Sequence, residues 1–260
     1  MILILPATFI LLFSFFNQKD NQRISIINSY LILSFQIFFI TEFLSFFNYL
    51  KGNAVFFSHL FLAVLYYYFL PKLKFPKIHF LSLNIVDKTL MIAIIFIAII
   101  TLFIGGMSPP NNWDSMTYHL SRIQYWIQNS GVYFFDTNNF RQNLYSPFSE
   151  FFILHTQILS NTDIFANLVQ WFCFIINMIA VSLICKELQL NKTLQMLSSF
   201  FICSMPIVVL QSSNTKNDLV LSTFVLLFYY YQLAGITSHS KSNIFFSGLA
   251  LGLGVLTKGT

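Results

Sequence analysis

Apolar segments long enough to cross a lipid bilayer recur along the chain and restrict what it can fold into. A membrane span takes roughly 20 apolar residues, and in lipid every backbone polar group must be bonded within such a helix. Only 9% of the residues are charged, whereas a soluble domain has about 25%. We therefore predict an all-α, polytopic transmembrane protein with about eight spans. The expected spans are residues 1–16, 24–46, 54–70, 88–106, 164–183, 193–210, 219–234 and 244–257.

The basic residues indicate how the spans are oriented, because Lys and Arg in short loops stay on the cytoplasmic side. If Lys72, Lys74, Lys77 and Lys88 lie inside, alternation of the spans places nine of the 14 basic residues inside. The other five are Lys19, Arg23, Lys186, Lys192 and Lys241. Most acidic residues then face outside. The net charge of +5 is therefore a topology signal, and we expect no nucleic-acid partner.

The long connection at residues 107–162 falls on the outside and contains two predicted helices. After Asp114, apolar residues recur at helical spacing beside a polar flank that includes Arg122. Ser146 and Pro147 indicate the start of a second helix. We expect both helices to rest in the membrane interface. The chain thus divides into N-terminal spans (1–106), an outer loop (107–162) and further spans (163–260).

Several polar and glycine-containing motifs follow one another between residues 105 and 260. They are Trp113-Asp114-Ser115, Tyr118-His119-Leu120, Arg141-Gln142-Asn143, Tyr145-x-Pro147, Ala166-Asn167-Leu168-Val169-Gln170, Asn214-Thr215-Lys216-Asn217-Asp218, Gly248-Leu249-Ala250-x-Gly252-Leu253 and Leu256-Thr257-Lys258-Gly259. Their order resembles the C-type glycosyltransferases, which are multispanning membrane enzymes that use polyprenyl-phosphate sugars. Protein O-mannosyltransferases and lipid A aminoarabinose transferases are examples. No single motif is specific, but the order is.

The resemblance implies transfer of a sugar from a polyprenyl-phosphate donor to an acceptor at the outer membrane face. It assigns the general base to the acidic residue of the first outer loop, here Asp114, and a supporting acid to Asp218. The leaving phosphate needs positive charge at headgroup depth, for which Lys258, Arg141 and Arg122 are the candidates.

Each candidate also has a structural explanation. Asp114 could cap the helix that follows it, Asp218 could start the next span, and Asp163 could cap the span expected from residue 164. Lys258 could reach the interface without a ligand, as long cationic side chains near helix ends often do. Arg122 and Arg141 could anchor the outer loop in the same way.

No cofactor is expected. His119 and His155 could join Asp114 or Glu150 around zinc, but they lack the tight spacing of a metal site, and we disfavour a divalent metal. Family members often have two adjacent acids where this chain has Asp114 and Ser115, which argues against a dicarboxylate scheme. The three cysteines lie in or beside apolar runs and are expected to fill space.

Two other classes remain open. A transporter would place its ionisable residues within the spans, whereas here they lie in outer loops. A noncatalytic scaffold, or a remnant of an enzyme, would keep the fold without the activity. Related enzymes are usually longer and have more spans, so the resemblance implies an N-terminal half. The composition suggests a multi-pass protein of a bacterial inner membrane, with its active side facing the periplasm or the exterior.

Overall fold

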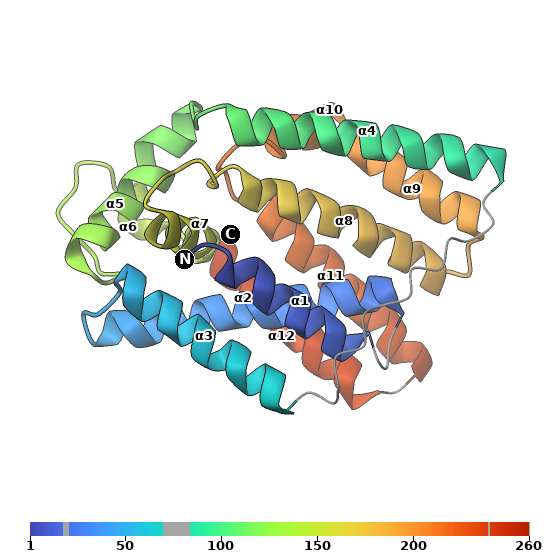
Figure 1. The fold of residues 1–260 in the computed structure, drawn as a ribbon. Coiled ribbons are helices and arrows are strands. Elements are labelled where there is room, and N and C mark those ends of the chain that lie inside the picture. The colour runs from blue at the N-terminus through green and yellow to red at the C-terminus, as the bar shows by residue number, and fades with distance from the viewer. Residues whose placement is uncertain (18–20, 70–83, 239, 260) are drawn as a thin grey trace.

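A computed structural model describes residues 1–17, 21–69, 84–238 and 240–259, and the described part of the chain is built from helices (Figure 1). The helices are α1 (Ile4–Phe16), α2 (Gln22–Phe46), α3 (Gly52–Phe69), α4 (Ile85–Met107), η1 (Ser115–His119), α5 (Leu120–Asn129), α6 (Arg141–Leu144), α7 (Phe148–Ser160), α8 (Leu168–Glu187), α9 (Lys192–Ser204), α10 (Pro206–Gln211), α11 (Asp218–Ser238) and α12 (Lys241–Thr257). The predicted all-α membrane class is confirmed.

Five of the described helices are long and apolar enough to cross a membrane, against the eight spans predicted. These five are α2, α3, α4, α8 and α11. Helices α1 and α12 are apolar but shorter, with 13 and 17 residues. Their sequences have the composition of spans, but their helical parts end before the length that a bilayer core requires.

The continuous span predicted at residues 193–210 is wrong, because the chain bends at Pro206. Helix α9 ends at Ser204, Met205 is extended (φ −63°, ψ 125°), and α10 starts with Pro206 as its first residue. Proline has no N–H to donate and forces the preceding residue out of the helical region. The result is a 13-residue helix followed by a six-residue one.

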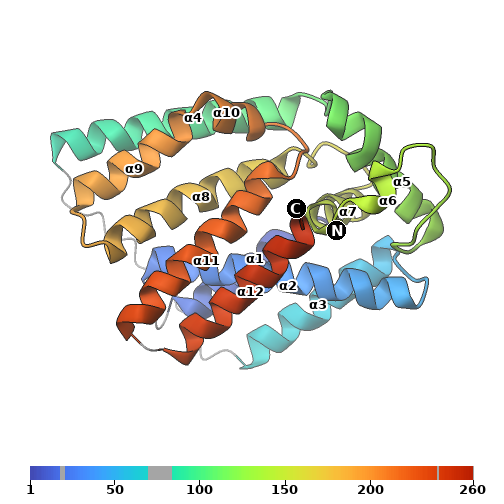
Figure 2. The same ribbon diagram turned by 180° about the vertical axis from the view of Figure 1, so that it is seen from behind.

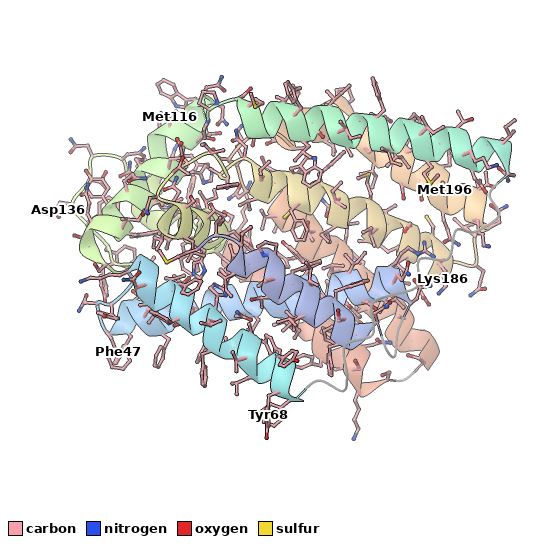
Figure 3. The ribbon with its side chains drawn as sticks, in the orientation of Figure 1. Phe47, Tyr68, Met116, Asp136, Lys186 and Met196 are labelled. Atoms are coloured by element: carbon pink, nitrogen blue, oxygen red, sulfur yellow. The ribbon has the colours of Figure 1, made fainter. Side chains whose placement is uncertain are left out.

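The helices run between two ends of the molecule, as the predicted alternation requires. At one end, Arg23 donates to Ser182 (3.0 Å) and Gln195 (2.9 Å), so the starts of α2 and α9 meet the end of α8. The other end holds α5, α6 and α7. Asp136 and Lys186 mark these opposite ends, which we call the outer and inner ends (Figure 3). Lys19, Lys72, Lys74 and Lys77 of the orientation argument lie outside the described residues.

The core is formed where α8 and α11 pack side by side and α2 crosses them (Figure 2). Tyr30 of α2 lies against Phe224 of α11 and is stacked parallel to Phe152 of α7, with ring centroids 5.7 and 6.2 Å apart. Phe148, at the start of α7, is fully buried against Phe224 as well (5.7 Å). Helix α7 therefore enters the core from the outer end.

A chain of buried hydrogen bonds attaches α7 to α2 and α3. Gln36 Nε2 donates to His59 Nδ1 (2.7 Å), His59 Nε2 lies 2.9 Å from His155 Nδ1, and His155 Nε2 lies 2.8 Å from Thr41 Oγ1. Tyr66 donates to Gln36 Oε1 (3.1 Å), which fixes the orientation of the amide. Because an amide nitrogen only donates, the network assigns the proton to Nε2 of each neutral imidazole.

Thr41→Val should destabilise the fold by about 1–3 kcal/mol, because it leaves the buried His155 Nε2–H without an acceptor. The change keeps the shape of the side chain, so packing is preserved. Thermal unfolding of the purified protein in mild detergent measures the effect.

Thr8→Val is the matched control, since Thr8 is equally buried but bonds only to the Ile4 carbonyl of its own helix (2.8 Å). It should lower the unfolding temperature less than Thr41→Val does. Equal losses in the two variants would contradict an energetic role for the hydrogen-bond chain.

Candidate functional site at the outer end

The outer segment opens with a helix cap supplied by Asn112. Its Oδ1 accepts the Ser115 N–H (2.9 Å). Asp114 already has helical backbone angles (φ −65°, ψ −41°), and its side chain makes no capping hydrogen bond. The capping alternative for Asp114 is therefore wrong, and its carboxylate is left for other partners.

Asp114 meets two cations from different parts of the chain. Its Oδ2 lies 3.2 Å from Lys216 Nζ, and its Oδ1 lies 3.9 Å from Arg141 Nη1. The carboxylate is partly exposed (31%), so a substrate could reach it. Next to it, the Thr215 hydroxyl donates to the Ser115 hydroxyl in a buried hydrogen bond. These contacts join the first outer loop to the turn before α11.

The same turn leads to a second ion pair. Asp218, at the start of α11, lies 3.6 Å (Oδ1 to Nζ) from Lys258, which directly follows α12. The Gly259 N–H donates to the Ser146 hydroxyl (3.3 Å), which attaches the end of α12 to the start of α7. Lys258 thus lies beside Asp218, as predicted, while Asp114 pairs with Lys216 instead.

The buried centre of the outer segment is Glu150 of α7, which was expected near the start of a surface helix and as a disfavoured zinc ligand. Glu150 is fully buried, forms an ion pair with Arg122 of α5 and is hydrogen-bonded to Nδ1 of His119 in η1. The Ser149 hydroxyl donates to its second oxygen (2.6 Å). A carboxylate within an apolar helix needs such partners, because an unpaired buried charge is very costly. A single carboxylate in an apolar helix was therefore the sequence signal that Glu150 pairs with a cation.

The charges around Glu150 determine its protonation state. Burial alone would raise the pKa of this carboxyl above its ordinary 4.5, but the Arg122 guanidinium and His119 lower the pKa to about 2. The ion pair therefore persists at all ordinary pH values.

Arg122, one of the three predicted phosphate ligands, is directed into the protein. Its side chain is 1% exposed, and besides Glu150 it donates to the carbonyls of Tyr145 (2.8 Å) and Ser146 (3.2 Å). Its guanidinium lies 5.2 Å from the Trp126 ring. Ser115, Tyr118 and Arg122 of the polar flank thus face the protein, whereas Tyr125 is exposed. Arg122 holds the segment before α7 in place. Among the predicted phosphate ligands, Arg141 and Lys258 remain partly exposed.

The expected surface position of the second helix is wrong. Ten of the 13 residues of α7 are buried, including both of its ionisable residues. Helix α7 is buried because Glu150 and His155 on its polar face pair with residues of other helices. Its polar and apolar faces therefore both lie in the interior.

Two further sequence candidates lie apart from Asp114. Asp163 does not cap a helix, because α8 starts only at Leu168, and its carbonyl accepts the Ala166 N–H (2.8 Å) within a turn. His155 belongs to the network with His59, whereas His119 pairs with Glu150. The two histidines proposed for a zinc site thus lie in separate networks.

An apolar cavity of about 400 Å³ lies among α1, α2, α4, α7 and α8. Its lining is almost entirely apolar and includes Phe9, Leu102, Phe152, Leu168 and Trp171. Leu102 and Leu168 belong to the two helices that flank the outer segment.

The fold and the charges at its outer end define a polytopic membrane protein with a polar site at one membrane face. Residues 146–260 match the model of the dolichyl-phosphate-mannose-protein mannosyltransferase family, which supports the resemblance to the C-type membrane glycosyltransferases in this part of the chain. Asp218 and Lys258 lie within the matched region, and Asp114 and Arg141 precede it. No curated protein and no solved structure matches the chain.

Glu150→Gln should destabilise the protein by about 3–5 kcal/mol, because Arg122 would remain buried without a counter-charge. The pH dependence has a defined sign. A carboxyl whose pKa is about 2 when folded and 4.5 ordinarily contributes stability above pH 4.5 that is lost as the pH falls towards 2. Unfolding temperatures measured between pH 7 and pH 2 check both statements.

Asp136→Asn is the control, because Asp136 is an exposed acid of the outer segment and has no ion pair among the described residues. It should leave the unfolding temperature at pH 7 nearly unchanged. The acid-induced loss should be smaller in Glu150→Gln than in the unchanged protein, and equal losses would rule out the assigned role of Glu150.

Proposed function

We propose that this protein transfers a sugar from a polyprenyl-phosphate donor to an acceptor hydroxyl at the outer membrane face. The observation that carries the proposal is the turn at residues 215–218. It pairs Lys216 with Asp114 of the first outer loop and Asp218 with Lys258 at the end of α12. Two carboxylates and three cations, with Arg141 as the third, are thereby collected at one end of a membrane protein.

Asp114 is the proposed general base. Its carboxylate is partly exposed and lies beside Lys216 and Arg141, and a carboxylate within reach of the acceptor hydroxyl can accept its proton. The acceptor O–H bond breaks, its proton goes to Asp114, and the oxygen forms a bond to the anomeric carbon of the sugar. Attack from the face opposite the phosphate inverts the configuration at that carbon.

The bond between the anomeric carbon and the phosphate oxygen breaks in the same step, and its electron pair stays on the phosphate. We assign Lys258 and Arg141 to the oxygens of this leaving group, because both are partly exposed cations at the outer end. Asp218 is the supporting acid, which holds Lys258 until the donor binds. The donor phosphate can replace the carboxylate as the partner of Lys258.

The apolar cavity suits part of the isoprenoid chain of the donor. Burial of each additional CH₂ contributes about 0.8 kcal/mol, and no charged side chain lines the cavity. The helices α4 and α8 connect this cavity to the outer segment. We place the lipid chain there and the phosphate at the outer end.

The proposed step needs no metal ion, since Ser115 follows Asp114 where a second carboxylate would help to bind one. For the cellular location we propose a bacterial inner membrane with the site on the periplasmic side. The abundance of Phe and the low share of charged residues support this assignment.

Asp114→Asn should lower the rate of sugar transfer by about 10²–10⁴-fold, the usual contribution of a general base. Donor binding should persist, because the amide keeps the size of the side chain. A radiolabelled polyprenyl-phosphate sugar in membranes from the native host provides the assay. Asp136→Asn, an exposed acid of the same outer segment, should have full activity. Full transfer by Asp114→Asn would rule out Asp114 as the general base, whereas no transfer by the unchanged protein would favour the scaffold alternative.

Lys258→Met should weaken binding of polyprenyl phosphate by about fivefold, since a Lys near an anionic headgroup contributes about 1 kcal/mol. Native mass spectrometry of the detergent-purified protein, with added polyprenyl phosphate, measures the bound fraction. Lys51→Met is the control, because Lys51 is an exposed cation that lies over the Tyr49 ring (5.6 Å). If the two variants bind the lipid equally well, Lys258 is not a phosphate ligand.

A further inference from the structure

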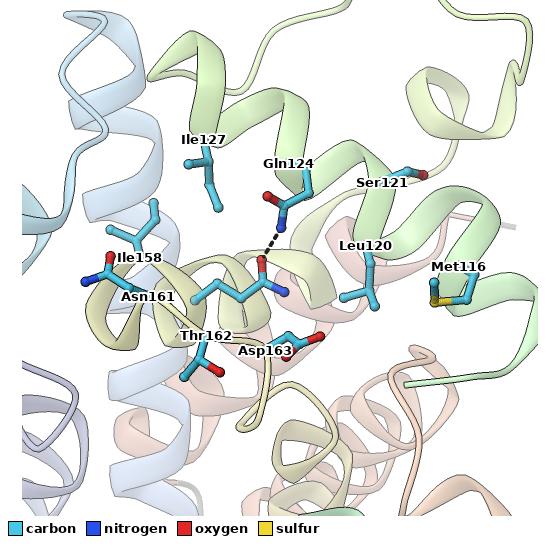
Figure 4. Close-up of a pocket in the computed structure, with 10 residues that line it drawn as sticks. Met116, Leu120, Ser121, Gln124, Ile127, Ile158, Asn161, Thr162 and Asp163 are labelled. Carbon is cyan, nitrogen blue, oxygen red and sulfur yellow. Dashed lines mark hydrogen bonds between the residues drawn. The ribbon is translucent and has the colours of Figure 1, made fainter. Parts of the chain in front are cut away.

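A second cleft, of about 580 Å³, lies at the outer end between α5 and α7 (Figure 4). One wall is formed by Leu120, Gln124 and Ile127 of α5, and the other by α7 with the turn at Thr162 and Asp163. Its volume lies within the usual range of ligand sites, roughly 300–1,000 Å³. The proposed transfer step uses none of its lining residues.

The charge of this cleft differs from that of the Asp114 site. The ten residues that line it, all in the described part of the chain, include one carboxylate, Asp163, and no Lys, Arg or His. Asp163 has no ion-pair partner among the described residues. A phosphate would be repelled here, so the cleft does not suit the donor headgroup. It favours neutral or amine-bearing ligands.

Two side-chain amides in the cleft are held in a fixed orientation. Gln124 Nε2 donates to Gln157 Oε1 (2.9 Å), and Gln157 is 95% buried, with a relative exposure of 5%. Within the described residues, this leaves the Gln157 amino group as a free donor and Gln124 Oε1 as a free acceptor. Sugar hydroxyls both donate and accept, so neighbouring hydroxyls of one ring can pair with both amides.

The remaining lining residues suit a carbohydrate as well. Leu120, Ile127 and Ile158 provide an apolar surface for the C–H face of a sugar ring, while Thr162 adds a hydroxyl. Ser121 contributes little, because its hydroxyl already donates to the Thr117 carbonyl (2.9 Å) and accepts from Gln142 (2.8 Å).

We propose that this cleft binds the acceptor as a neutral or amino-sugar glycan. The inference rests on the proposed sugar transfer and names its acceptor class. The cleft belongs to α5, which continues directly from η1, and η1 follows Asp114. The base and the acceptor cleft therefore lie along one continuous helical segment. The Arg122–Glu150 pair connects α5 to α7 and so fixes the separation of the two walls.

A glycan array tests the proposal, with the fluorescently labelled protein in lipid nanodiscs as the probe. The protein should retain neutral or amino-sugar oligosaccharides in preference to acidic ones. Gln124→Ala should lower that binding at least tenfold, and Asp163→Asn should reduce the preference over acidic glycans. Gln128→Ala, an exposed amide of α5 outside the cleft, should bind like the unchanged protein.

Binding of no glycan, or equal binding by Gln124→Ala, would overturn the proposal. Retention of a Ser/Thr-rich peptide in place of glycans, lost in Gln124→Ala, would also overturn it and assign the cleft to a peptide. Polyprenyl phosphate binding by the same nanodiscs separates the hypothesis about the sugar donor from the hypothesis about the acceptor cleft. Glycan binding without polyprenyl phosphate binding would reject the donor assignment alone, whereas the reverse result would reject the cleft alone.

Discussion

The buried pairing of Glu150 with Arg122 is the interaction on which the outer end depends. It neutralises a charge that an apolar helix cannot hold alone, and it connects α7 to α5. Arg122 also binds the carbonyls of Tyr145 and Ser146, and the Ser146 hydroxyl accepts the N–H of Gly259 beside Lys258. One buried guanidinium therefore links the core to the position of an exposed lysine. Because an uncompensated charge there would cost several kcal/mol, the arrangement has little freedom to shift.

Much of the fold and part of the site could be predicted from the sequence. Alternating apolar spans sufficed to place Asp114, Asp218 and Lys258 at one end, because each span reverses the direction of the chain. The break at Pro206 also had a local signal, since proline inside an apolar run interrupts a helix. Residues 193–210 are apolar enough for one span, but the backbone restriction at Pro206 divides them into two helices.

The interior of the outer segment could not be predicted in the same way. A helix with an apolar and a polar flank normally turns its polar flank towards water, but Glu150 provides a stronger partner for Arg122 than water does. Local sequence indicates that Glu150 requires a cation, yet Arg122 and Arg141 were both available. Only the tertiary packing of α7 against α5 selects between them, and it leaves Arg141 near Asp114.

The contacts of the outer end also connect the part of the chain that matches the family model to the part that precedes it. Asp114 and Arg122 precede the matched region, whereas Glu150 and Lys216 lie within it. Asp114 forms an ion pair with Lys216 at the surface, and Arg122 forms one with Glu150 in the interior. Asp114 is held in place by Lys216 of the matched region and therefore belongs to the same site. The candidate site thus includes residues of the first outer loop that precede residue 146.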